Sequence, residues 1–224
     1  MDWFESLTGF AEETGPTGYR ANRARLEVDG RRLRSKVNGR EYNVGLLELI
    51  SLRELRARAC TGTTVPGEPI IRLVEGEAGA LHRLPENAGA LFQVASQFNL
   101  LEMIGPDISP EAGVARYAYD RTQGPACAIA AGAATIYRNY FAAVGDSIGQ
   151  TRTRQLDGFA DLGMALAKAL RARPDSLWRM ENGYALFPEA GLERIAAYIL
   201  DLDEDGRDAI SASICRLGCT GTSR

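Results

Sequence analysis

Four carboxylates gather in the middle of the chain, and this density suits the hydrolysis of a glycosidic bond. Between positions 102 and 120 the sequence carries Glu102, Asp107, Glu111 and Asp120. Cleaving a bond to ribose passes through an oxocarbenium-like state, in which a carboxylate can stabilise the positive ring or activate water. We predict Asp120 and Glu102 as catalytic residues, with Asp107 as a third candidate. Asp107 and Glu111 each follow a proline, so they fit a turn or a helix cap as well.

A helix start follows these carboxylates directly. Gly124-Pro125-Ala126 opens a block of small residues that predicts a helix from Ala126 to Phe141, because proline is favoured in a first helical turn. The dipole and the unpaired amides of such a start favour a diphosphate group. The residues predicted to bind it are Thr122, Gln123, Gly124, Pro125 and Ala126. A tightly packed helix start explains the same small residues, and Asp120 would then serve as its cap.

Two amides follow a predicted buried strand, Ala90 to Ala95. Gln97 and Asn99 can both donate to and accept from ribose hydroxyls. We therefore predict them as ligand-binding residues, with ribose contact expected for at least one. Asn99 also fits a turn that needs no ligand.

The surrounding pattern is that of an α/β chain. The predicted strands are 23–28, 32–37, 41–46, 70–74, 90–95, 177–180 and 184–187, and the predicted helices are 51–59, 126–141, 153–171 and 188–200. Asp29-Gly30 and Asn38-Gly39 favour the tight turns of a β meander. Ser51 and Glu54 have the spacing of a capping box. The apolar runs 70–74 and 90–95 suit a parallel sheet, whose strand ends form a ligand crevice.

These stretches resemble the macrodomain family. The succession of Ile70–Val74, Glu75-Gly76-Glu77-Ala78, Ala90–Val94 and Gly113-Val114-Ala115-Arg116-Tyr117 is similar to the order of the family's motifs. Asn182-Gly183-Tyr184-Ala185-Leu186-Phe187-Pro188 resembles its second, phosphate-cradling loop. The likeness covers about residues 70–200, and it extends to a divergent branch that includes a bacterial effector hydrolase of ADP-ribosylated arginine. The family's triple glycine is absent here, and Glu77 stands where the family has an aspartate.

The resemblance implies a three-layer α/β/α fold with a mostly parallel mixed sheet and an N-terminal β-rich addition. It also implies ADP-ribose as the ligand. Glu77 would accept a hydrogen bond from adenine, and Gly183 and Tyr184 would lie in the loop around the diphosphate. Phe187 would stack on adenine. Glu77 also fits a solvated loop carboxylate, and large aromatics such as Phe187 usually belong to the core.

Composition limits the partners. A net charge of -3 and a pI near 5.4 argue against nucleic acid, which requires a concentrated basic face. His82 is the only histidine and the four cysteines form no C-x-x-C pair, so we predict neither a metal site nor a cofactor. The longest apolar run, 127–137, is too short to cross a bilayer, and the first residues lack a signal-peptide pattern. We therefore expect no membrane partner and a cytoplasmic protein.

These inferences combine into one hypothesis about organisation and function. Residues 1–65 form a capping segment and meander, 66–208 the macrodomain-like core, and 209–224 an irregular tail. The protein is predicted to be a metal-independent ADP-ribosyl hydrolase that binds ADP-ribose and releases it from an ADP-ribosylated protein substrate, arginine being one candidate linkage. The alternatives are a reader that binds ADP-ribose without cleaving it, or an unrelated nucleotide-binding α/β protein.

Overall fold

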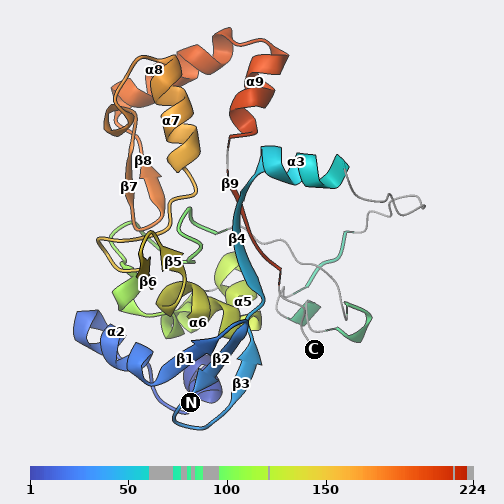
Figure 1. The fold of residues 1–224 in the computed structure, drawn as a ribbon, viewed down its shortest axis with the longest axis vertical. Helices are drawn as coiled ribbons and strands as arrows, with labels where there is room; N and C mark the ends of the chain where they lie inside the picture. The colour runs from blue at the N-terminus through green and yellow to red at the C-terminus, as the bar shows by residue number, and fades with distance from the viewer. Residues whose placement is uncertain are drawn as a thin grey trace.

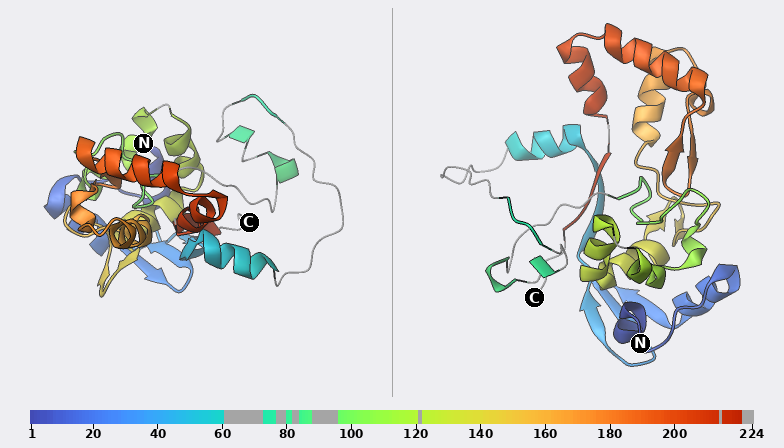
Figure 2. Two further views of the ribbon diagram at one scale, coloured as in Figure 1. Left: turned by 90° about the horizontal axis from the view of Figure 1, so that it is seen from above. Right: turned by 180° about the vertical axis from the view of Figure 1, so that it is seen from behind.

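The computed structural model describes residues 1–60, 73–76, 80–81, 84–87, 96–120, 122–213 and 215–220. These residues form two lobes, and a long two-stranded ribbon runs beside them (Figure 1). The N-terminal elements and the middle of the chain make the lower lobe in this view, and the segment after residue 159 makes most of the upper lobe. The view from behind shows the same division (Figure 2).

The lower lobe begins with two helices and a three-stranded antiparallel sheet. Its first elements are α1 (Trp3–Thr8), α2 (Gly15–Ala24), β1 (Leu26–Asp29), β2 (Arg32–Ser35) and β3 (Glu41–Asn43). Gly30 and Gly39, in the two connections, take positive φ angles of 56° and 71°, which glycine adopts without a steric cost. The predicted meander is confirmed, and its residues Leu26 and Leu33 are buried.

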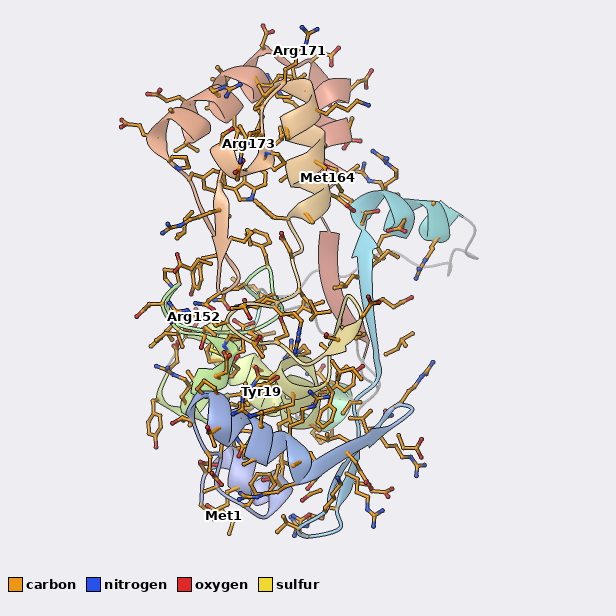
Figure 3. The ribbon with its side chains drawn as sticks, turned by 60° about the vertical axis from the view of Figure 1, so that its left-hand side comes forward. Met1, Tyr19, Arg152, Met164, Arg171 and Arg173 are labelled. Atoms are coloured by element: carbon orange, nitrogen blue, oxygen red, sulfur yellow. The ribbon has the colours of Figure 1, made fainter. Side chains whose placement is uncertain are left out.

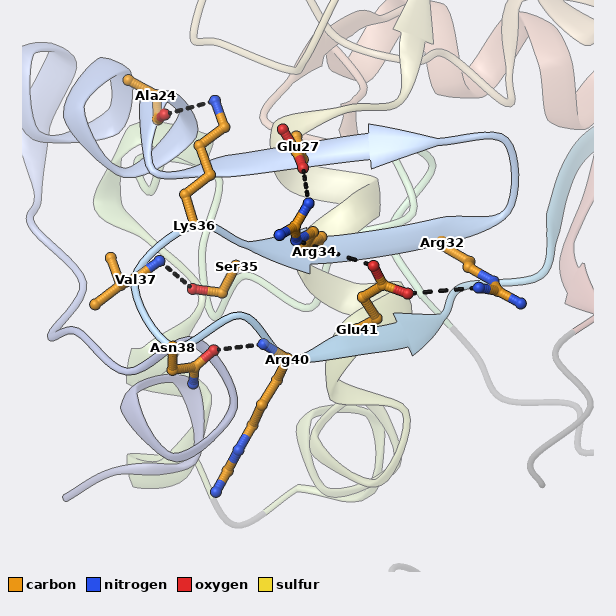
Figure 4. A network of polar contacts seen from close by, with 10 residues as sticks. All are labelled: Ala24, Glu27, Arg32, Arg34, Ser35, Lys36, Val37, Asn38, Arg40 and Glu41. Atoms are coloured by element: carbon orange, nitrogen blue, oxygen red, sulfur yellow. Dashed lines mark hydrogen bonds and ion pairs between the residues drawn. The ribbon is translucent and has the colours of Figure 1, made fainter.

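Charged residues line the exposed face of this sheet. Arg34 lies between Glu27 and Glu41, at nitrogen to oxygen distances of 3.2 and 3.9 Å, and Arg32 lies 3.4 Å from Glu41 (Figure 4). Exposed pairs of this kind each contribute at most about 1 kcal/mol to stability. Their clearer effect is on the orientation of the sheet. Because the charged face points to water, the opposite face, which carries Leu33, packs against the core.

The N-terminal segment packs on two central helices, α5 (Gln123–Ala130) and α6 (Gly132–Tyr140). Phe4 is completely buried, and its ring contacts those of Phe10 and Tyr140. The aromatic residues of the N-terminal segment therefore form part of the core of the lower lobe.

A break at Ala131 divides the helix predicted over 126–141. Ala131 has φ -106° and ψ 43°, which are not helical angles. A Cβ on Gly132 would lie 2.7 Å from Leu7, so the close approach of α1 favours glycine at the start of α6. Near the break, Thr135 Oγ1 donates to the Ala128 carbonyl at 2.6 Å.

The ribbon joins two segments that are far apart in the sequence. Strand β4 (Leu46–Ser51) pairs antiparallel with β9 (Cys215–Thr220). It leads into α3 (Leu52–Cys60), where the predicted capping box is confirmed: Glu54 Oε2 accepts from the Ser51 amide at 2.7 Å, and Ser51 Oγ accepts from the Glu54 amide at 3.2 Å. Residues 209–224 were expected to be irregular, yet β9 lies within them.

Replacement of Ser51 by alanine removes the hydroxyl that caps α3. We expect Ser51→Ala to lower the free energy of unfolding by about 1 kcal/mol, because one amide of the first turn loses its acceptor. Urea denaturation followed by circular dichroism measures the change. Ser51→Thr keeps a hydroxyl and should stay close to wild type. Equal losses in both variants would contradict the capping role.

The upper lobe consists of three helices and a hairpin around its own small core. Its elements are α7 (Ala160–Ala169), β7 (Arg179–Glu181), β8 (Tyr184–Leu186), α8 (Glu189–Asp201) and α9 (Glu204–Ser211). The core contains Leu162, Leu166, Leu177, Trp178 and Ile195. Asn182 and Gly183 both have positive φ, 48° and 83°, as a two-residue hairpin turn requires. The predicted strands on either side of Asn182-Gly183 and the helix after Pro188 are confirmed, and the two strands form a hairpin.

The remaining elements are short. They are the strands β5 (Ala143–Val144) and β6 (Ser147–Ile148) and the 3-10 turns η1 (Pro85–Asn87), η2 (Pro110–Ala112), η3 (Ala115–Tyr119) and η4 (Pro174–Ser176). The helix predicted over 153–171 is shorter in the structure, where α7 begins at Ala160. The residues before Ala160 form the connection from the lower lobe to the upper lobe (Figure 1). Arg152 lies near the junction, whereas Arg171 lies at the far end of the upper lobe (Figure 3).

The predicted macrodomain-like fold is wrong. The strands of the described residues form one three-stranded and three two-stranded sheets, and all of their pairings are antiparallel. The tight turns at Gly30 and Asn182 pair each strand with its neighbour, which precludes the crossover that a parallel pair needs. Of the predicted parallel strands, residues 70–72 and 90–95 lie outside the described residues, while Leu73 and Val74 are irregular and exposed.

Candidate functional site

A cavity of about 490 Å³ lies where the segment after Leu101 meets η3. Its lining residues are Glu102, Met103, Ile104, Arg116, Tyr117, Tyr119 and Asp120. The volume falls in the range of about 300–1,000 Å³ that small-molecule sites occupy. Two carboxylates, one guanidinium and two phenol rings therefore share one concave surface, and the two carboxylates are those predicted first from the sequence.

Glu102 is the most perturbed acid in this cavity. Its side chain is only 6% exposed. Burial raises the pKa of the Glu102 carboxyl to about 7, an effect that the nearby Arg138 opposes and the negative charge of Asp120 reinforces. No described residue donates a hydrogen bond to Glu102 Oε1, although that atom is buried. With a pKa near 7, about half of this carboxyl is protonated at neutral pH, and the protonated form can give its proton to a bound molecule.

Asp120, the residue directly after η3, lines the same cavity. It is partly buried, and its Oδ1 accepts from the Thr122 amide at 2.8 Å and from the Thr122 hydroxyl at 2.7 Å. These two bonds fix the carboxylate just before α5. Asp120 does not cap α5 as the alternative predicted, because the N-cap is Thr122 and the Asp120 carboxylate bonds to Thr122 instead of to an amide of the first helical turn.

The start of α5 faces Glu102 rather than open space. A Cβ on Gly124 would lie 2.2 Å from Glu102 Oε2, so the carboxyl rests directly against this glycine. A diphosphate at the helix start would have to share it with Glu102. Of the other residues predicted here, Thr122 is the exposed N-cap, Pro125 is buried and Ala126 is partly buried. Gln123 begins the helix, and its side chain lies outside the described part.

Three further residues surround Glu102, and none of them was predicted as a site residue. Tyr117 is buried, and its hydroxyl accepts from the Glu102 amide at 2.8 Å. Arg138 is 7% exposed and carries a positive charge close enough to lower the pKa of Glu102, while its Nη2 donates to Thr135 at 2.8 Å. Arg116 lies in the cavity wall. The only sequence signal for two of them, Arg116 and Tyr117, was the likeness of residues 113–117 to a glycine-rich motif of the macrodomain family.

The amides predicted to bind ribose hold the cavity segment to the β7–β8 hairpin. Gln97 Nε2 donates to the Met103 carbonyl at 3.0 Å and to the Tyr184 hydroxyl at 3.1 Å, and that hydroxyl also donates to Met103. Asn99 is completely buried; its Oδ1 accepts from the Leu101 amide and its Nδ2 donates to Gln155. Their hydrogen bonds to the protein fit the turn alternative for Asn99, and ribose contact stays a prediction.

The hairpin turn is packed tightly against these amides. A Cβ on Gly183 would lie 2.4 Å from Asn99 Oδ1, and the Phe98 amide donates to the Gly183 carbonyl at 2.9 Å. Burial raises the pKa of Tyr184, and the charges of Glu102, Asp120 and Asp107 act in the same direction. The structure therefore brings Gln97, Asn99, Gly183 and Tyr184 together beside the cavity.

The remaining predicted residues lie elsewhere. Asp107 is exposed in the turn after Gly105 and does not line the cavity. Phe187 lines a separate apolar cavity of about 220 Å³ in the upper lobe, where its ring lies 5.5 Å from that of Trp178. Glu77 lies outside the described residues.

The site must be interpreted from its own chemistry. Within the described ranges, no three His, Cys, Asp or Glu side chains gather as metal ligands, and no helix is long and apolar enough to cross a membrane. Glu102 and Asp120 combine a proton donor with a charged carboxylate in one cavity. The chain matches no protein family, no curated protein and no solved structure.

Proposed function

We propose that this protein hydrolyses a glycosidic bond, with Glu102 as the acid and Asp120 as the carboxylate beside the sugar ring. The observation that carries the proposal is the burial of Glu102, which raises its pKa to about 7 next to a second carboxylate in the same cavity. Glycosidases use two carboxyl groups in different surroundings, one that keeps its proton and acts as the acid and one that stays ionised.

The reaction assigns one task to each group. The protonated Glu102 gives its proton to the leaving nitrogen or oxygen as the bond to the ribose carbon breaks. Asp120 stabilises the positive charge that develops on the ring. Water then adds to that carbon and returns a proton to the Glu102 carboxylate. A carboxylate close to the ring acts mainly when this charge forms, so it lowers the barrier more than it strengthens binding.

ADP-ribosylated protein is the proposed substrate, and its phosphates match the one guanidinium in the cavity lining. Arg116 supplies this group, and guanidinium groups bind phosphate oxygens in a bidentate manner. Tyr119 is 87% exposed and offers a ring to a base or ribose. Since the macrodomain-like fold is wrong, ADP-ribose rests on these side chains and not on the fold.

Replacement of Asp120 by asparagine tests the assigned chemistry. We expect Asp120→Asn to slow release of ADP-ribose by about tenfold while the dissociation constant for free ADP-ribose changes less than about twofold, because only the transition state carries the ring charge. Release from arginine-modified protein and calorimetry with ADP-ribose measure the two quantities. A variant weakened equally in both would place Asp120 in binding alone.

An ADP-ribose reader is the second candidate. One observation favours it: Asp120 Oδ1 accepts hydrogen bonds from both the amide and the hydroxyl of Thr122. One of the two carboxylate oxygens is therefore already used in the turn and does not face a substrate. A reader would bind ADP-ribose and release none from any modified protein. Serine-linked and glutamate-linked substrates should be assayed beside the arginine-linked one, so that a wrong linkage is not mistaken for a reader.

A further inference from the structure

We infer that Glu12 is a positioning residue, which holds the wall of the cavity around Glu102 and Asp120. Glu12 lies in the loop between α1 and α2, far from these carboxylates in the sequence. It does not line the cavity. The inference rests on the proposed function for its effect on rate, whereas its effect on the geometry of Glu102 can be tested separately.

The Glu12 carboxylate collects donors from the segment before η3. Its Oε2 accepts from the Ala115 amide at 2.6 Å, and the Val114 amide is a further donor. Its Oε1 accepts from the Tyr140 hydroxyl at 2.6 Å. Burial raises the pKa of Glu12 while these three hydrogen bonds oppose the rise. The partly buried carboxylate is thus an acceptor for three protein donors.

Close packing fixes the same segment. Gly113 has φ 82°, and a Cβ there would lie 2.4 Å from Glu12 Oε2. From α1, Trp3 Nε1 donates to the Ala115 carbonyl at 3.1 Å. The backbone at Ala115 is therefore bound at both its amide and its carbonyl by side chains of the N-terminal segment.

The segment held in this way supplies most of the cavity wall. Turn η3 begins at Ala115, and the wall residues that follow are Arg116, Tyr117, Tyr119 and Asp120. Tyr117 transmits the position to the acid itself, because its hydroxyl accepts from the Glu102 amide. A movement of Ala115 would shift Tyr117 and Asp120 together and admit water to Glu102.

Replacement of Glu12 by glutamine tests this inference. A glutamine has one acceptor oxygen instead of two, so the bonds from the Val114 and Ala115 amides and from the Tyr140 hydroxyl cannot all persist in their present direction. We expect Glu12→Gln to move the titration midpoint of the Glu102 carboxyl from about 7 toward 4.5, because a loosened wall rehydrates it. Carbon-13 NMR of labelled glutamate follows the midpoint, with the Glu102 signal assigned by its absence in Glu102→Gln. The rate of ADP-ribose release should fall by about tenfold.

Two comparison variants separate positioning from stability and charge. Glu13→Gln removes the neighbouring carboxylate, which pairs with the exposed Arg25 at 2.7 Å, and should leave the Glu102 midpoint unchanged. Tyr140→Phe removes one Glu12 contact but leaves Val114 and Ala115 bound, so it should move the midpoint less than Glu12→Gln does. A midpoint that moves equally in all three variants would contradict the inference.

The test keeps its meaning if Glu12→Gln does not fold or if the wild type releases no ADP-ribose. Trp3→Phe removes the bond to the Ala115 carbonyl and leaves the Glu12 carboxylate in place, and it should move the Glu102 midpoint in the same direction by a smaller amount. An unchanged midpoint in a folded Glu12→Gln, or in Trp3→Phe where the former is unfolded, overturns the inference. Absence of release from the wild type overturns the proposed function alone, since the titration requires no substrate.

Discussion

Glu102→Gln is expected to slow the release of ADP-ribose at pH 6.5 by about 100-fold or more, with little change in affinity for free ADP-ribose. General acid catalysis contributes roughly 10² to 10⁴ to a rate, and glutamine keeps the shape of Glu102 but has no acidic proton. The wild-type rate should fall as pH rises through about 7, because the raised pKa of Glu102 sets the fraction that still carries a proton. In Glu102→Gln this decline should be absent.

Glu111→Gln is the matched control for this experiment. Glu111 comes from the same run of carboxylates, but its oxygens accept from the Arg152 amide at 2.8 and 3.0 Å, and it does not line the cavity. Its variant should release ADP-ribose at nearly the wild-type rate and with the same pH profile. Equal losses in Glu102→Gln and Glu111→Gln would remove the catalytic assignment.

Local structure could be predicted wherever a few adjacent residues determine it. The turn at Gly30, the strands on either side of Asn182-Gly183 and the capping box at Ser51 depend on contacts within about four positions, and all of them are confirmed. The break at Ala131 could not be predicted, because the block of small residues around it favours a helix throughout. What shapes that region is the approach of α1, which the sequence does not show.

The global fold could not be predicted because its pairings join distant segments. Strand β4 pairs with β9, and neither sequence contains a signal for the other. The apolar runs 70–74 and 90–95 indicated a parallel sheet, but a short apolar run alone does not distinguish one strand arrangement from another. The likeness to macrodomains depended on the order of such runs, so it failed together with the sheet.

The chemistry of the site was only half visible in the sequence. Glu102 and Asp120 could be chosen because carboxylates are dense in that stretch, and the structure places both in one cavity. The pKa of Glu102 could not be predicted, since it depends on burial by Tyr117 and Gly124 and on the charge of Arg138. Glu12 was missed for the same reason, as it lies in a separate part of the chain.

Glu102→Gln is also expected to stabilise the folded protein above pH 7. The pKa of Glu102 is about 7 in the folded protein and 4.5 as an ordinary carboxyl, so between these values the folded state binds more protons than the unfolded state. Stability therefore falls as pH rises through this window, and the loss is complete above about pH 7. Glutamine does not ionise, so the variant should gain about 2 kcal/mol over wild type at pH 8.5 and almost nothing near pH 4.5.

Urea denaturation of both proteins at pH 5 and pH 8.5 measures this difference. The comparison between the two pH values matters more than either value, because it cancels any change in packing that glutamine brings at both. Glu111→Gln should show no such dependence on pH. A gain above pH 7 beside a loss of ADP-ribose release would mean that the buried acid is retained at the expense of stability, as catalytic groups often are. A difference that is equal at both pH values would show that Glu102 titrates like an acid in water, and it could then not serve as the proton donor at neutral pH.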